Sequence, residues 1–164
     1  KEYAPFSFTT EETGGIIGNG DITMDWIVHV LKRTVDTQYR TKADRRHTFL
    51  AGSSMGGLMT LYGLLAYPEV FSRGAALSPS LWIDAEKVKA MIRHARVKRN
   101  TVLYMDYGAL EFADHPHSRS LFAEVSALLI EKRVLLNSRI VPRGTHCEAS
   151  WEKQIPFFMK TLFE

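Results

Sequence analysis

The chain has 164 residues, 45% of them apolar, which is typical of one globular domain (1–164) rather than a disordered chain. Its formal charge of +3 comes from 21 basic and 18 acidic residues dispersed along the sequence, which argues against nucleic-acid binding. No apolar run has the length of a membrane span, and the single Cys147 excludes an internal disulfide, so we expect a protein of the reducing cytoplasm with no membrane partner.

Segments with helical spacing alternate with short apolar runs along the chain. Residues 14–20 are rich in glycine but lack the glycine order of a phosphate-binding loop, so a plain loop is expected there. Expected helices cover 24–35, 58–65, 85–95, 118–132 and 151–163, and expected strands cover 47–51, 74–77, 101–105 and 136–141. Strands separated by helices predict an α/β fold, with a largely parallel sheet and helices on both faces.

The expected helix at 24–35 is amphipathic. Its polar side carries charged residues, Trp26 is expected to pack against the protein, and the apolar side is formed by Met24, Ile27, Val28, Leu31 and Val35.

The strongest chemical signal is Gly52-x-Ser54-x-Gly56, which lies between an apolar run expected to be a buried strand and an apolar helix. A strand-to-helix elbow holds its central serine in strained geometry with the hydroxyl exposed. Small residues on both sides let strand and helix approach closely, and the Met55 amide at the helix start is free to donate to an oxyanion. We therefore predict that Ser54 is a nucleophile.

A serine hydroxyl is a weak nucleophile at neutral pH and needs a general base, normally a histidine on a loop that follows a strand. His146 meets this requirement, because it follows the expected strand 136–141 through a short loop. That loop is expected at the carboxyl edge of the sheet, where open α/β sheets bind ligands.

The acid that orients the histidine should come from the segment after strand 101–105, since serine, acid, histidine is a known chain order of the triad. Asp106, Glu111 and Asp114 compete for this position. Glu111 lies further into the loop, with reach toward His146, and is preferred. Asp106 is the main alternative, although at the strand end it could equally brace the backbone.

Other candidate residues carry weaker signals. Trp82 and Trp151 could line an acyl pocket or pack in the core, and the sequence does not choose between these roles. The segment Asp114-His115-Pro116-His117 holds two imidazoles but no further spaced ligands. We therefore expect no metal and no cofactor.

Several short blocks of the sequence form a pattern along the chain: Glu2-Tyr3-x-Pro5-Phe6, Tyr39-Arg40-Thr41, His47-Thr48, Ala51-Gly52-Ser53-Ser54-Met55-Gly56-Gly57, Leu77-Ser78-Pro79-Ser80-x-Trp82, Asp106-Tyr107-Gly108-x-x-Glu111 and Gly144-x-His146-x-Glu148-x-x-Trp151. Taken together, these blocks resemble the putative esterase family of the α/β-hydrolase superfamily, which includes enterochelin-esterase-like and esterase D-like hydrolases. The resemblance covers nearly the full chain and implies a serine esterase fold. It implies Ser54 as nucleophile, His146 as base and Glu111 as acid, although some enterochelin-esterase-like members work without the acid.

The sequence departs from the family pattern at its N-terminal side. Members begin with further strands and a loop that supplies a second oxyanion amide, and this chain starts after that region, so the domain is expected to be N-terminally incomplete. An exposed sheet edge would favour association with another chain, which leaves a homo-oligomer open.

Three functions are therefore consistent with the sequence. The first is a carboxylic ester hydrolase with a small-molecule ester substrate, working through an acyl-enzyme on Ser54. The second is an acyltransferase of the same family, and the third is a catalytically silent α/β module used for binding or assembly. The acyl and alcohol groups of a substrate do not follow from the sequence.

Overall fold

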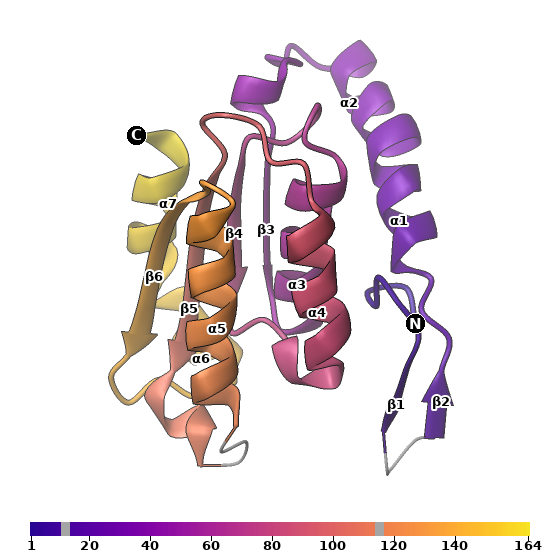
Figure 1. Ribbon diagram of the computed structural model, residues 1–164. Helices are drawn as coiled ribbons and strands as arrows, with labels where there is room; N and C mark the ends of the chain where they lie inside the picture. Colours follow the sequence, from indigo (N-terminus) through magenta and orange to yellow (C-terminus); the bar gives the residue numbers. More distant parts are fainter. Residues whose placement is uncertain (11–13, 114–116) are drawn as a thin grey trace.

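A parallel four-stranded sheet forms the centre of the computed structural model, which describes residues 1–10, 14–113 and 117–164 (Figure 1). Its strands lie in chain order: β3 (Phe49–Ser53), β4 (Arg73–Leu77), β5 (Val102–Gly108) and β6 (Leu135–Val141). In the register, Ser53 lies beside Leu77 and Leu77 beside Asp106, so the carboxyl ends of neighbouring strands meet at one edge.

Helices cover both faces of this sheet, which confirms the predicted α/β class. Alternate side chains of a strand point to opposite faces, and Ala76 packs in a core with Leu58 and Val125, whereas Ala75 packs on the other side with Leu162. The first face is covered by α3 (Met55–Ala66), α4 (Ala85–His94) and α5 (Ser118–Glu131), and the second by α7 (Ile155–Phe163) (Figure 1).

Two strands differ from their expected form. The short helical turn Arg45–His47 (η2) moves the start of β3 from residue 47 to Phe49, and β3 is an edge strand with Ala51 exposed rather than a fully buried strand. Strand β5 continues to Gly108, so Asp106 lies inside a strand and not in the loop that was expected to supply the acid.

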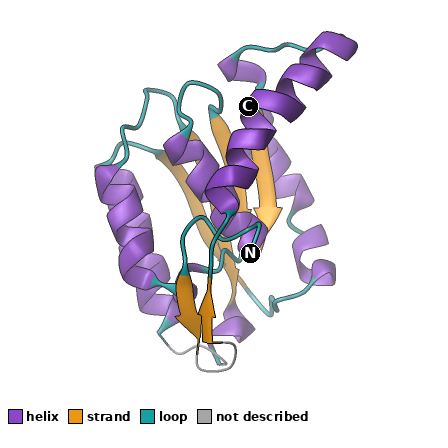
Figure 2. Cartoon of the chain, turned by 90° about the vertical axis from the view of Figure 1, so that its right-hand side faces the viewer, coloured by secondary structure: helices purple, strands orange, loops and turns teal. Residues whose placement is uncertain are grey.

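The N-terminal segment forms an antiparallel hairpin of β1 (Phe8–Thr10) and β2 (Gly14–Ile16), seen at the front of Figure 2. The plain loop expected at 14–20 is therefore wrong over its first three residues. Short strands of this kind depend on their pairing partner more than on local propensity. Gly14, at φ +67°, adopts a backbone conformation that favours glycine.

The expected helix at 24–35 is present and longer, running from α1 (Gly20–Trp26) through a π-helical segment η1 (Ile27–Leu31) into α2 (Lys32–Gln38). Its predicted apolar side is only partly buried: Met24 and Val28 are buried, but Leu31 is 41% exposed. Trp26, expected to pack, is 50% exposed. The wider π turn shifts the helical register, and α2 projects beyond the other helices (Figure 1).

The C-terminal helix expected at 151–163 is divided into α6 (Glu148–Glu152) and α7. Pro156 lies in the first turn of α7, where its missing N–H costs no helical hydrogen bond. None of the described helices combines the length and apolar character required to cross a bilayer.

Candidate active site

Ser54 occupies a sharp elbow between β3 and α3. Its backbone lies at φ 56° and ψ −122°, a conformation that non-glycine residues rarely adopt and that marks stored strain. The Ser54 N–H donates to the carbonyl of Leu77 at 2.9 Å, which ties the elbow to the end of β4. The elbow therefore holds the serine side chain at the carboxyl edge of the sheet.

Close packing explains one glycine of the motif but not the other. A Cβ atom on Gly52 would lie 2.4 Å from the carbonyl oxygen of Gly56, so no larger residue fits at position 52. At Gly56, in contrast, an added Cβ would meet no described heavy atom within 4 Å. The expectation that both flanking glycines are required for close approach is wrong at Gly56. The second tight position is Gly57, where a Cβ would lie 3.0 Å from the Leu77 carbonyl.

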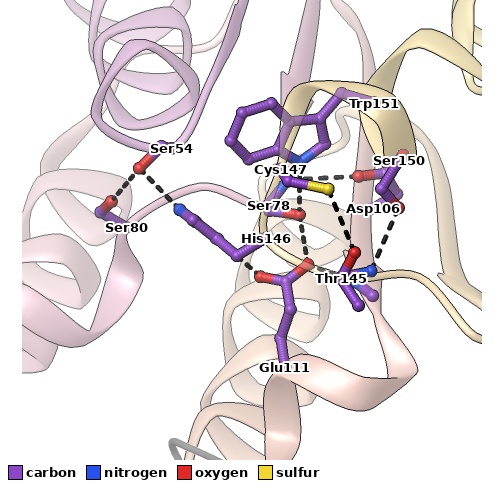
Figure 3. Close-up of polar contacts among 11 residues, drawn as sticks. Ser54, Ser78, Ser80, Asp106, Glu111, Thr145, His146, Cys147, Ser150 and Trp151 are labelled. Carbon is purple, nitrogen blue, oxygen red and sulfur yellow. Dashed lines mark hydrogen bonds and ion pairs between the residues drawn. The ribbon is translucent and has the colours of Figure 1, made fainter.

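The structure brings Ser54, His146 and Glu111 into one hydrogen-bonded relay (Figure 3). His146 Nε2 lies 2.9 Å from Ser54 Oγ, and His146 Nδ1 lies 2.7 Å from Glu111 Oε2. The three residues come from three segments that follow β3, β5 and β6, with Glu111 on the helical turn Ala109–Phe112 (η4). The imidazole remains 41% exposed, so a substrate can reach it.

A close crossing of two backbones brings Glu111 within reach of His146. A Cβ on Gly108 would lie 2.4 Å from the carbonyl oxygen of Gly144, and the Leu110 N–H donates to the same oxygen at 3.0 Å. The end of β5 thus packs directly on the loop that carries His146.

Glu111 is buried and fully engaged. Its Oε1 accepts hydrogen bonds from the Ser78 hydroxyl at 2.7 Å and from the Gly108 N–H at 2.8 Å, while Oε2 faces His146. Burial by itself would raise the pKa of Glu111, but the hydrogen bonds from His146, Ser78 and Gly108 outweigh it and lower that pKa below its usual value. The carboxylate is therefore ionised at neutral pH.

Glu111→Gln should flatten the acid dependence of stability. A carboxyl group whose pKa is lowered by folding stabilises the native state above its unfolded pKa, and this contribution is lost as the pH falls through the folded pKa. In thermal unfolding from about pH 7 to about pH 3, the Tm advantage of the wild type over Glu111→Gln should shrink on acidification. An advantage that stays constant or widens would contradict the ionised, hydrogen-bonded state.

The other acid candidates do not join the relay. Asp106 is buried, and its two oxygens accept from the Ser78 backbone N–H at 3.1 Å and from the Tyr104 hydroxyl at 2.8 Å. Burial raises its pKa against the opposing effect of these hydrogen bonds. Asp106 therefore holds the ends of β4 and β5 together. Asp114, like His115, lies outside the described residues.

The remaining predicted residues are Met55, Trp82 and Trp151. Met55 is the first residue of α3, so its N–H has no acceptor within the helix. Trp82, on the turn Leu81–Ile83 (η3), is 43% exposed, which rules out simple core packing. Trp151 is half-buried, and its ring meets the His146 ring edge-on at 5.0 Å between centroids.

Two buried serines at the site were not anticipated from the sequence. Ser80 Oγ lies 3.3 Å from Ser54 Oγ, and Ser78 Oγ links Glu111 to the Trp151 indole (Figure 3). Both belong to the Leu77-Ser78-Pro79-Ser80 block, which is the one signal that pointed to this segment. Within the described ranges, no three His, Cys, Asp or Glu side chains are grouped so that they could hold a metal ion.

Comparison with known proteins gives consistent matches. A family model described as "Putative esterase" matches residues 19–159. The chain is 35% identical over 78 residues to the iron(III) salmochelin esterase of Escherichia coli O6:H1 (strain CFT073), a match that covers 47% of this chain and 19% of that protein.

Similar solved structures have the same kind of fold. An IroE-like serine hydrolase from Shewanella oneidensis has a TM-score of 0.75 at 19% identity, with 98% of this chain and 54% of that chain covered. The enterobactin esterase FES from Shigella flexneri has a TM-score of 0.66 at 25% identity, with 88% and 38% covered. The chain spans less than two thirds of the length of each of these proteins and of the salmochelin esterase.

Proposed function

The chain belongs to the putative esterase family, and from that premise we propose that it is a serine carboxylic ester hydrolase acting through an acyl-enzyme on Ser54. The observation that carries the proposal is the relay from Ser54 Oγ through His146 to Glu111, at 2.9 and 2.7 Å. A nucleophile, a base within hydrogen-bond reach and a third group that orients the base are the requirements for activating a serine.

In the acylation step, Ser54 Oγ attacks the carbonyl carbon of the ester as its proton passes to His146 Nε2. Glu111 holds Nδ1–H, which fixes the tautomer that leaves Nε2 as the acceptor and stabilises the imidazolium that forms. The Met55 N–H donates to the oxyanion. The alcohol then leaves with the proton from His146, and Ser54 carries the acyl group.

In the deacylation step, water takes the place of the alcohol. His146 removes a proton from the water, whose oxygen attacks the acyl carbonyl, and then returns a proton to Ser54 Oγ as the carboxylic acid is released. Related proteins are named for esters of salmochelin and enterobactin. We propose siderophore esters as the first natural substrates to test.

The test is hydrolysis of p-nitrophenyl acetate with rapid acid quenching and peptide mass spectrometry. We expect p-nitrophenol release above the buffer rate and an acetyl group on the peptide that contains Ser54. Release no faster than in buffer would contradict the proposal. Transfer of the acetyl group to an added alcohol in preference to water would indicate an acyltransferase instead.

A further inference from the structure

Ser78 contacts the acid of the relay through the carboxylate oxygen that does not face His146 (Figure 3). It follows the last residue of β4 and is only 1% exposed. Its Oγ lies 2.7 Å from Glu111 Oε1 and 3.0 Å from the indole Nε1 of Trp151. A buried hydroxyl with two polar contacts at such distances is held in one orientation.

The chemistry of the two partners determines which atom donates. An indole N–H can only donate, so Ser78 Oγ accepts from Trp151. An ionised carboxylate can only accept, so the Ser78 hydroxyl proton points to Glu111. The hydrogen bonds therefore run in one direction, from Trp151 through Ser78 to the carboxylate.

This direction decides which carboxylate oxygen meets the histidine. Oε1 of Glu111 already accepts from Ser78 and from the Gly108 N–H, so Oε2 is the oxygen left for His146 Nδ1. Three donors placed around two oxygens fix the plane of the carboxylate as well as its position. That plane sets the orientation of the imidazole ring.

Ser78 is itself held from the backbone side. Its φ is +40°, a value that non-glycine residues rarely adopt, and its N–H donates to Asp106 Oδ1, whose other oxygen accepts from the Tyr104 hydroxyl. Backbone strain maintained by surrounding hydrogen bonds is typical of positions that serve a site. The buried Asp106, unused by the relay, thereby acquires a role in placing Ser78.

We propose that Ser78 is a positioning residue of the active site, and that Trp151 orients its hydroxyl so that Glu111 presents Oε2 to His146. Trp151 also meets the His146 ring edge-on, at an interplanar angle of 83°, so one side chain contacts both His146 and the serine that holds Glu111. The inference rests on the proposed function, because it assigns Ser78 to the orientation of the general base.

Ser78→Gly removes the hydroxyl. Because glycine tolerates the positive φ at this position, the variant adds no backbone strain that could itself reduce activity. We expect kcat to fall by about 10- to 100-fold with KM unchanged, because Ser78 acts through Glu111 and misplaced groups cost rate. Trp151→Phe keeps an aromatic ring beside His146 but removes the N–H, and should lower kcat less than Ser78→Gly.

Ser72→Ala is the matched control. Ser72 is also a buried serine, immediately before β4, and its hydroxyl has no hydrogen-bond partner among the described residues. Its removal should leave kcat and KM unchanged. An equal fall in kcat in Ser72→Ala and Ser78→Gly would mean that any buried serine near β4 is needed for folding, and would overturn the positioning role.

The measurement independent of turnover is the proton NMR signal of the His146 Nδ1–H, which a short bond to a carboxylate moves far downfield. We expect this signal in the wild type and in Ser72→Ala, and its shift or loss in Ser78→Gly while the protein stays folded. An unchanged signal in Ser78→Gly, or none in the wild type, would overturn the inference. Because the signal requires no substrate, it distinguishes failure of this inference from absence of esterase activity.

Discussion

Ser54→Ala is expected to lower ester hydrolysis by about 10⁴-fold or more, because removal of an activated nucleophile leaves only the binding and oxyanion contributions to the rate. The contact at stake is the 2.9 Å hydrogen bond between Ser54 Oγ and His146 Nε2. Alanine at position 54 leaves the backbone strain unchanged, because alanine and serine are equally disfavoured at positive φ. The change should therefore affect chemistry and leave unfolding nearly unaltered.

Measurement of kcat/KM for p-nitrophenyl acetate in Ser54→Ala, His146→Ala and the double variant tests this expectation. Residues that act as a unit have non-additive effects, so the double variant should be no slower than the slower single variant. If the fold reduction in kcat/KM of the double variant equals the product of the two single reductions, Ser54 and His146 work separately. Turnover in Ser54→Ala equal to that of the wild type would exclude Ser54 as nucleophile.

Gly52→Ala is the second variant with a large expected effect. Its Cβ would lie 2.4 Å from the Gly56 carbonyl oxygen and 2.5 Å from the carbonyl carbon, both backbone atoms that cannot rotate away. Forcing a methyl group into such a contact costs on the order of 1–3 kcal/mol of stability. The displaced elbow would also move Ser54 from His146, and a shift of about 1 Å costs on the order of 10²-fold in rate.

Gly56→Ala is the control within the same motif. An added Cβ meets no described atom within 4 Å there, and position 56 lies in the first turn of α3, where alanine is a better helix former than glycine. Thermal unfolding should show a lower Tm for Gly52→Ala and an unchanged or higher Tm for Gly56→Ala. Equal destabilisation by both variants would contradict the packing described at the elbow.

Local patterns predict much of this fold because the strands and helices have strong periodicity. The strand expected at 74–77 and the helices expected at 85–95 and 118–132 each match an observed element within one residue at either end. The side of a helix that is buried is harder to predict, since it depends on what packs there. Val35 fits the apolar stripe of the first helix and is nevertheless 37% exposed.

The candidate site also contains residues that the sequence predicts and residues that it does not. The elbow motif and chain order point to Ser54 and His146, and the structure places them 2.9 Å apart. The supporting residues are not predictable from spacing: Ser78 lies 33 positions from Glu111 and 73 from Trp151. The folded register, in which the ends of β4 and β5 lie side by side, brings Ser78 near Glu111, and Trp151 reaches Ser78 from α6.

Labelling with a fluorophosphonate, followed by peptide mass spectrometry, tests the central claim most directly. The reagent phosphonylates a serine only where the hydroxyl is activated, with Ser54 Oγ displacing fluoride and His146 taking the proton. We expect one adduct per chain, on Ser54, and its loss in His146→Ala. A folded protein with no adduct, or with an adduct on a different serine, would contradict the assignment of Ser54 as the nucleophile of an ester hydrolase.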